Sequence, residues 1–251
     1  MVNSSRTIRS LVAVGLAIGL VAAACGSSSS TSNPLGPADG TSAPKATGGA
    51  ELTSGLSANL DSLDSYKFTW SLTGSSSGSG ASPDDSGAVT VSGTIINKPS
   101  PAALVNDLGI QFIVIGNRAW ISSDGNSWTT TDPSTVSVTD LLPSNDYATW
   151  FDANSTNFTA TGEETRNGID CIHYTGNSSL GAMYAAAGVS AGFQADLWVA
   201  RNGNYPVSGV YGFAAAAGGQ SGAFYYTFDI TNVNDASNTV TPPTNVISVP
   251  T

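Results

Sequence analysis

Apolar and polar residues alternate with a period of two along several separate segments of this chain. The clearest segments are Tyr66–Leu72, in which Phe68 and Trp70 fall on one side, Phe193–Val199 and Phe224–Ile230. Successive side chains of an extended strand point to opposite faces, so this alternation is typical of strands that bury one face only. Such one-sided burial is common in antiparallel sheets. The pattern therefore predicts a fold dominated by a sheet with one apolar face.

Turn signals separate these segments at the short spacing expected of hairpins. Asn167-Gly168 is the strongest of them, because a type I′ turn needs a positive φ at both central residues. Gly116-Asn117 and Asp124-Gly125-Asn126 are similar, so the strands around them should form a meander. The further strands that we expect lie at 89–95, 102–105, 110–115, 118–122, 128–130, 158–165, 169–174 and 205–213.

Helices are expected in three places. Leu52, Leu56, Leu60 and Leu63 form one apolar stripe, which predicts a helix over 51–64. Between Pro133 and Asn154 the alternation stops, and one or two short helices interrupted at Pro143 are expected. The Ala-rich stretch 178–188 predicts a third helix. Ser/Gly-rich residues 74–87 and residues 218–222 are predicted loops.

The N-terminal residues have the pattern of an export signal. Arg6 and Arg9 precede an uncharged apolar run from Leu11 to Ala24, which is shorter than the roughly 20 residues that a membrane-spanning helix needs. The run ends Val21-Ala22-Ala23-Ala24-Cys25-Gly26, and small residues directly before a cysteine resemble the lipobox of bacterial lipoproteins. The resemblance implies cleavage before Cys25 and a diacylglyceryl group on its thiol. An ordinary secretory signal with an incidental cysteine is the alternative.

These features divide the chain into four parts. Residues 1–24 are the predicted lipoprotein signal peptide, and residues 25–50 are the lipidated Cys25 with a flexible Ser/Gly/Pro linker. Residues 51–233 form the folded domain, and 234–251 are a polar tail that is either an extended edge or disordered. Acyl chains gain about 0.8 kcal/mol per buried methylene, so two or more would hold the domain at a membrane. We expect it on the extracytoplasmic face of the cell membrane.

Charge argues against nucleic acid as a partner. The chain of 251 residues has a formal net charge of −10, and removal of Arg6 and Arg9 with the signal peptide makes it more negative by two. Phosphate neutralisation needs a basic patch, which this composition does not supply. The remaining partners expected are the membrane, through the lipid anchor, and a lipid or acylated ligand. The sequence leaves the oligomeric state undetermined.

Catalytic and metal-binding patterns are weak. Cys171 and His173 share a strand face, but two ligands do not make a zinc site, and a Cys–His pair needs an orienting partner and an oxyanion hole. Cys171, without a partner once Cys25 is lipidated, is expected to be buried and inert, and His173 to be buried with one hydrogen bond. We therefore expect no catalytic residue, no metal, no cofactor and no enzyme activity.

Three segments resemble the actinobacterial lipoproteins of the LppX/LprG type (LppX_LprAFG) and, more remotely, the carriers of the Lol system. The first is the amphipathic helix that leads into the aromatic strand Tyr66–Leu72. The second is Ile113-Val114-Ile115-Gly116-Asn117-Arg118-Ala119-Trp120-Ile121. The third is Ala195-Asp196-Leu197-Trp198-Val199-Ala200-Arg201-Asn202-Gly203-Asn204-Tyr205-Pro206-Val207. The likeness spans roughly residues 50–232.

The resemblance implies an α+β fold, a strongly curved antiparallel β half-barrel with helices across its concave face (LolA/LppX-like). It also implies an apolar cavity that binds or carries lipid or acylated molecules. The Ala/Gly-rich stretch 181–192 and the Ser/Gly-rich stretch 74–87 depart from the family pattern. The residues expected to line the cavity wall are Phe68, Trp70, Leu72, Phe112, Val114, Leu197, Val199, Phe224, Tyr226 and Phe228.

Two other functions remain open. A surface interaction or structural module would have the same sheet with a filled core and no ligand, since alternating apolar faces are what any antiparallel sheet shows. A hydrolase would need a triad or metal cluster that the sequence does not offer.

Overall fold

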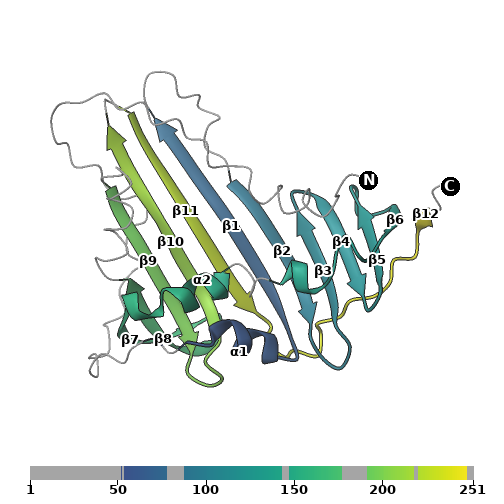
Figure 1. Cartoon of the computed structure of the whole chain (residues 1–251), viewed down its shortest axis with the longest axis horizontal. Helices are drawn as coiled ribbons and strands as arrows, with labels where there is room; N and C mark the ends of the chain where they lie inside the picture. The colour runs from purple at the N-terminus through teal and green to yellow at the C-terminus, as the bar shows by residue number, and fades with distance from the viewer. Residues whose placement is uncertain are drawn as a thin grey trace.

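One large sheet dominates the protein (Figure 1). The structure is a computed structural model that describes residues 52, 54–77, 88–142, 147–176, 191–217 and 220–247. The predicted signal peptide, the linker and the helix expected over 178–188 lie outside these residues. Within the described residues two short α-helices accompany the sheet, α1 (Leu56–Ser62) and α2 (Tyr147–Ala153), with 3-10 turns at Thr139–Leu141 and Ser155–Asn157.

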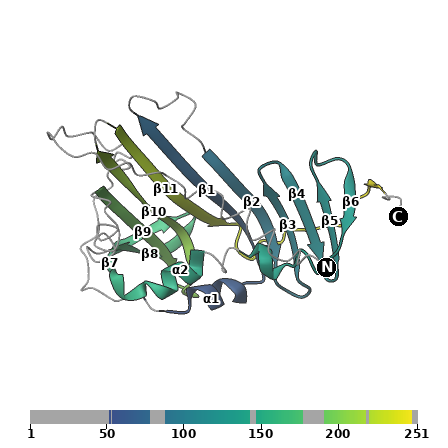
Figure 2. The same ribbon diagram turned by 45° about the horizontal axis from the view of Figure 1, so that its top comes forward.

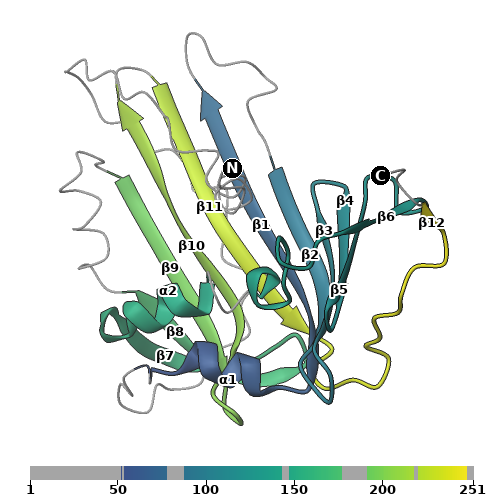
Figure 3. The same cartoon turned by 45° about the vertical axis from the view of Figure 1, so that its right-hand side comes forward.

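The sheet has 12 strands in the order β12-β6-β5-β4-β3-β2-β1-β11-β10-β9-β8-β7. All neighbours are antiparallel except β12, which pairs in parallel with β6. The order begins at β12 and ends at β7, so the sheet is open, and β3–β6 stand at an angle to the long strands β9–β11 (Figures 2 and 3). The strands are β1 (Ser65–Ser77), β2 (Ala88–Ile96), β3 (Ala102–Asp107), β4 (Ile110–Ile115), β5 (Arg118–Ser122), β6 (Trp128–Thr131), β7 (Phe158–Arg166), β8 (Ile169–Gly176), β9 (Ala191–Ala200), β10 (Pro206–Ala217), β11 (Gln220–Thr231) and β12 (Val246–Ile247).

Hairpin chemistry explains the tight connections. Asn167 and Gly168 have φ of 53° and 78°, which confirms the expected type I′ geometry between β7 and β8. Leu108 and Gly109, with φ of 52° and 84°, make a similar turn between β3 and β4. Asp124 holds the β5–β6 turn because its carboxylate accepts the backbone N–H groups of Asn126 and Ser127, both at 2.8 Å.

The register gives the sheet an inner face, which we define as the face that carries Phe68 and Trp70. Residues directly opposite in neighbouring strands point to the same face. One such row contains Val91, Trp70, Phe228, Gly209, Leu197 and Tyr174. A second row contains Ile230, Phe68, Gly93, Val105 and Phe112, and a third contains Tyr66, Ile95, Ala103 and Val114.

Two glycines in these rows make room for aromatic rings. The ring of Phe228 lies over Gly209 of the neighbouring strand, where a Cβ would overlap it. In the same way Phe68 lies over Gly93, where a Cβ would come within 2.7 Å of the ring. Since Cβ atoms essentially never approach so closely, the absence of a side chain at both positions lets these rings pack flat on the sheet.

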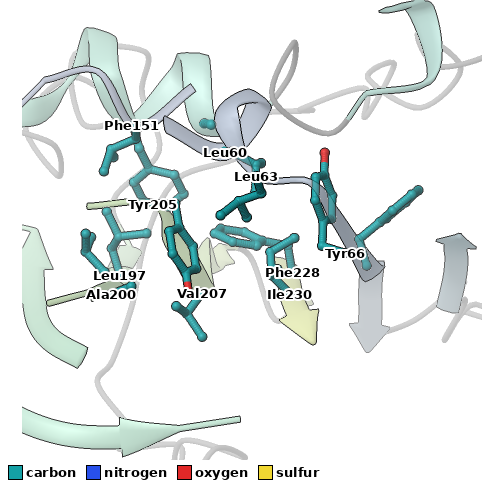
Figure 4. Close-up of a cluster of buried hydrophobic side chains, with 14 of the residues drawn as sticks. Leu60, Leu63, Tyr66, Phe151, Leu197, Ala200, Tyr205, Val207, Phe228 and Ile230 are labelled. Carbon is teal, nitrogen blue, oxygen red and sulfur yellow. The ribbon is translucent and has the colours of Figure 1, made fainter. Parts of the chain in front are cut away.

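The main core lies between the inner face and the two helices, at the lower ends of β9, β10 and β11 in Figure 1. Leu56 and Leu60 of α1 and Phe151 of α2 are almost fully buried against the strands. Figure 4 shows Leu60, Phe151 and Phe228 gathered between helix and sheet. Burial of side chains of this size contributes about 1.5–3 kcal/mol each, so this cluster is a main source of stability.

The C-terminal segment is not a loose tail. It leaves β11, runs along β3–β6 and ends as β12 beside β6 (Figure 3). Val240 packs on Ile113, Trp120 and Trp128, which form a small core on the face opposite to the inner face. Of the two alternatives for this segment, the extended edge is therefore the one observed over residues 234–247.

Several predicted boundaries were wrong. The first helix covers Leu56–Ser62 rather than 51–64, because Gly55 has φ of 96° and cannot continue a helix toward the N-terminus. β1 extends through Ser77 into the predicted Ser/Gly loop, because pairing with β11 satisfies its backbone. For the same reason residues 220–222 belong to β11 rather than to a turn.

Candidate functional site

The inner face changes from buried to partly exposed along its strands. Its lower rows, which contain Tyr66, Phe68, Ile95 and Val105, are buried. We call them the buried rows. Farther up the same strands Trp70, Leu72, Val91, Val89, Tyr211, Tyr226, Phe224 and Asp107 are all half-buried. The row of Trp70 is itself divided: Phe228, Leu197 and Tyr174 are buried and are counted with the buried rows, whereas Trp70, Val91 and Asp107 are half-buried. We call the half-buried positions the partly exposed rows, and they are the candidate site.

Aromatic side chains of α2 join the helix to the partly exposed rows. The ring of Trp150 stacks on Tyr211 with centroids 4.6 Å apart and an interplanar angle of 12°. Tyr211 in turn stacks on Tyr226 at 4.7 Å, and Phe224 meets Tyr226 edge-on at 4.6 Å. Contacts of this geometry contribute about 0.5–1.5 kcal/mol each beyond the buried area. The result is a continuous aromatic surface that runs from the helix up the sheet.

A second branch of this aromatic surface reaches β1. Tyr147 of α2 stacks on Phe228 at 5.8 Å and lies 5.7 Å from Trp70, which is also 5.7 Å from Tyr226. Tyr147 thus lies at the boundary between the buried Phe228 and the half-buried Trp70. Side chains of α2 therefore mark where the core ends and the partly exposed rows begin.

The structure places all the predicted wall residues on the inner face. Register with Phe68 and Trp70 puts them there, although the strands that carry them are far apart in sequence. They nevertheless divide in two. Phe68, Val114, Leu197, Val199 and Phe228 are buried, the first and last at 6% and 5% exposure, and belong to cores. The partly exposed members are Trp70, Leu72, Phe112, Phe224 and Tyr226.

Two hollows stand out on the described surface, and neither is lined by the predicted wall residues. One, of about 360 Å³, lies between the C-terminal segment at Thr241–Asn245 and the outer side of β4 and β6. The other, of about 340 Å³, is lined by Ile110, Ile121 and Ile247 near the top of the meander. Ile110 and Ile121 share rows with Trp70 and Phe68, so this second hollow lies on the inner face.

Polar groups without partners occur on this apolar face. The indole N–H of Trp70 and the hydroxyl of Tyr66 are buried and make no hydrogen bond with any residue that the structure describes. Burial raises the pKa of Tyr66, and nearby Asp61 adds to the effect. An unpaired buried donor costs about 1–3 kcal/mol, so these groups reduce the stability that the surrounding rings provide.

On the opposite face a polar cluster surrounds His173. Its Nε2 lies 2.9 Å from Asp196 and its Nδ1 lies 3.4 Å from Glu164. The ring stacks on Trp198 at 4.5 Å, and the guanidinium of Arg166 lies 4.6 Å from the centroid of the same indole. The expected burial of His173 was wrong, because its side chain is 25% exposed, whereas the expected single hydrogen bond is present and joins it to Asp196. The pairing of β8 with β7 and β9 sets carboxylates on both sides of the ring.

Electrostatics in this cluster follow from its hydrogen bonds. Burial alone would raise the pKa of Asp196, but hydrogen bonds from His173, Gln194 and Thr175 hold it below its usual value. The indole of Trp198 donates to Glu164, which ties β9 to the edge strand β7. These contacts link β7, β8 and β9, and a structural role accounts for all of them.

Cys171 is buried, as expected, and its thiol donates to the carbonyl of Ile169 at 3.3 Å. Burial raises its pKa to about 11, with the hydrogen bond from the Arg166 backbone acting in the opposite direction. A thiol of this pKa is almost entirely protonated at neutral pH and is a poor nucleophile.

Within the described ranges, no group of three or more His, Cys, Asp or Glu side chains is placed to hold a metal ion. Over the same residues, none of the helices has the length and apolar character needed to cross a bilayer.

Comparison with known proteins adds little. No protein-family model matches the chain, and no curated protein matches its sequence. Two solved structures that resemble it are the crystal structure of MucB in complex with MucA(peri), at 14% identity and a TM-score of 0.31, and the complex structure of Pseudomonas aeruginosa MucA/MucB, at 12% and 0.28. The alignments cover 73% and 68% of this chain and 54% of each of those chains, so the chain spans about half of their length. Likeness at this level indicates neither a shared fold nor a shared partner.

Proposed function

We propose that the protein is a lipoprotein of the cell envelope that binds the acyl chain of a lipid or acylated molecule on its inner face. The chain is exported, cleaved before Cys25 and anchored by lipid on that residue at the extracytoplasmic side of the membrane. It is not an enzyme and uses no cofactor or nucleic acid. The observation that supports ligand binding is that one continuous face changes from a packed core to half-buried aromatic side chains.

The physical argument concerns what an acyl chain needs. A hydrocarbon chain gains roughly 25 cal/mol for each Å² of apolar surface that it and its site remove from water. Trp70, Tyr211, Tyr226 and Phe224 present a wide aromatic surface that the protein itself covers only in part. An acyl chain laid on these rings would complete their burial.

The architecture that suits this function is a half-barrel of the LolA/LppX kind, with its helices across the concave face. The open sheet order and the contacts of α1 and α2 with the inner face support this assignment. In such an arrangement α2 is the natural lid, because the rings of Tyr147 and Trp150 pack on the aromatic rings of the sheet.

The acyl-chain proposal is tested by fluorescence quenching. The full chain carrying Cys25→Ser, which has no acyl chains of its own, is titrated with a neutral glyceryl ester of dibromostearic acid. Bromine quenches tryptophan on contact, so Trp70 and Trp150 should be quenched. Replacement of both by Phe should remove most of the quenching, whereas Trp198→Phe on the opposite face should leave it intact. Quenching that survives loss of Trp70 and Trp150 would refute binding at the inner face.

A surface interaction module with a filled core is the second candidate. It is favoured by the deep burial of Leu197, Val199 and Phe228, which leaves no room for a ligand beneath the helices. It predicts that organic extracts of the purified protein contain no stoichiometric lipid by mass spectrometry. The acyl-binding proposal predicts the opposite result.

The anchor is tested separately. Mass spectrometry of the N-terminal peptide from membrane-extracted protein should find a diacylglyceryl group on Cys25 and no residue before it. The Cys25→Ser variant should retain its signal peptide. An unmodified Cys25 at a processed N-terminus would indicate an ordinary secretory signal.

A further inference from the structure

One acidic side chain lies among the apolar positions of the partly exposed rows. Asp107 is the last residue of β3, and the register places it opposite Val91 on one side and Ile110 on the other. Val91 is opposite Trp70, so Asp107 is in the same inner-face row as the aromatic site. Strands are about 4.8 Å apart, which puts Asp107 roughly 10 Å from Trp70 across the sheet.

Asp107 has no partner in the described residues. It makes no side-chain hydrogen bond or ion pair there, although it is half-buried and burial raises its pKa. By contrast, Asp124 and Asp196 have lowered pKa values, because their carboxylate oxygens accept hydrogen bonds from neighbours. A carboxylate that is partly desolvated and unpaired costs stability, and a ligand that pairs with it recovers that cost.

Cations of the described chain lie elsewhere. The strand register places Lys67 and Arg118 on the face opposite to the inner face. Arg166 lies on that opposite face too, over Trp198. Lys98 pairs with Asp64 at 3.1 Å, and Arg201 pairs with Glu163 at 2.8 Å. No described lysine or arginine is therefore available beside Asp107 to neutralise an anionic head group.

The position of Asp107 suits the head group of an amphiphilic ligand rather than its tail. Asp107 adjoins the β3–β4 turn, in which Leu108 is 67% exposed, and Ile110 at the start of β4 is 40% exposed. A polar head held by Asp107 would reach water at this margin of the sheet. A tail attached to that head would extend over Val91 toward Trp70, Leu72 and Tyr226.

We propose that the inner face selects single amphiphiles with a positively charged amine head, which Asp107 binds, and disfavours amphiphiles with an anionic head. This inference rests on the proposed acyl binding and adds the class of head group. A charge-assisted hydrogen bond between ammonium and carboxylate supplies the preference, and the absence of a nearby cation supplies the discrimination.

The experiment compares three ligands with the same tail and different heads. The ligands are oleylamine, monooleoylglycerol and oleate, and each is used to displace the brominated glyceryl ester from the full chain carrying Cys25→Ser. The titrations are done at physiological ionic strength, so that long-range attraction of the amine to the acidic protein is screened. Oleylamine should bind roughly three- to tenfold more tightly than monooleoylglycerol, and oleate should bind most weakly.

Variants assign the preference to one residue. Asp107→Asn, which keeps the shape of the side chain, should abolish the advantage of oleylamine, and Asp107→Lys should make oleate the best of the three. Asp229→Asn changes net charge equally but lies on the opposite face, in register with Thr69, and should keep the wild-type order. Thermal midpoints no lower than that of the wild type establish that both Asn variants remain folded.

The outcomes separate the two proposals. If all three ligands bind the wild type equally, or if Asp107→Asn keeps the amine preference, acyl binding stands and head-group selection is refuted. An equal loss in Asp229→Asn would show a general charge effect and would also refute it. If the brominated ester does not quench Trp70 and Trp150 at all, the proposed function itself fails, and this inference with it.

Discussion

Two regions of the inner face share their strands, their register and their apolar composition, yet differ in what covers them. In the buried rows, Leu56, Leu60 and Phe151 from the helices complete the packing around Phe68 and Phe228. In the partly exposed rows, the same strands present Leu72, Tyr226 and Phe224 with only part of their surface covered. An apolar strand face therefore does not by itself distinguish a core from a binding wall. The distinction comes from the elements that pack on it.

The largest expected effect separates the two regions directly. Phe151→Ala should lower the free energy of unfolding by about 3–5 kcal/mol, because Phe151 is fully buried between α2 and the sheet. Phe224→Ala should cost only about 1 kcal/mol, because its ring is half-buried. Urea denaturation of both variants measures the difference. Equal losses would mean that the partly exposed rows are as tightly packed as the core.

A smaller loss is expected from adding one methyl group beneath a buried ring. Gly209→Ala places a Cβ where the ring of Phe228 lies, so the ring must shift, at a cost of about 1–3 kcal/mol. The matched control is Gly162→Ala, where a Cβ would meet nothing within 4 Å. Thermal denaturation of the two variants compares them. If Gly209→Ala is as stable as the control, the ring of Phe228 is free to move, and Phe228 does not belong to the tightly packed core.

The coupling of the two helices gives the next effect. One carboxylate oxygen of Asp152 accepts the N–H groups of Gly55 and Leu56, both at 2.8 Å, and the other accepts that of Ser57 at 3.0 Å, so α2 caps the N-terminus of α1. Asp152→Ala should cost about 1–2 kcal/mol and increase hydrogen exchange in α1. Asp152→Asn, which keeps one acceptor oxygen, should lose less. Unaltered exchange in α1 would show that the helices cover the buried rows independently.

The smallest effect concerns Asp107 and has the opposite sign. Burial raises the pKa of Asp107 in the folded protein, so its charged form disfavours folding, and Asp107→Asn should be slightly more stable than the wild type at neutral pH. As pH falls through this raised value the wild-type carboxyl becomes neutral and the difference should disappear. Destabilisation by Asp107→Asn at neutral pH would instead indicate that Asp107 serves the fold.

Acid also titrates other carboxyl groups that the wild type and Asp107→Asn share. The difference in stability between the two proteins is therefore what reports on Asp107. The Ser127 and Asn126 backbone hydrogen bonds lower the pKa of Asp124 from 3.8 to about 2. Stability from a group with a lowered pKa is present above its unfolded value and is lost as pH falls through the folded one. Urea midpoints at neutral and mildly acidic pH, above the range in which Asp124 titrates, therefore isolate the contribution of Asp107.

Much of the fold could be predicted because strand alternation and hairpin turns are local. The pairs Asn167-Gly168 and Gly116-Asn117 and the alternation of Phe68, Trp70 and Leu72 required no knowledge of distant residues. Errors arose where distant pairing overrode composition. Ser75–Ser77 have little strand propensity but pair with Ala223–Ser221, and Glu164 and Asp196 meet His173 only through the order of β7, β8 and β9.

The sequence by itself determined which residues share a face, because a period of two assigns every side chain of a strand to one side. It also determined where some hairpins turn, such as Asn167-Gly168, because positive φ suits few residues. Only the tertiary structure decided which part of that face is core, since this depends on where α1 and α2 pack. It also placed Asp107 beside Val91 in the row of Trp70, because the register between β2 and β3 is a property of the assembled sheet.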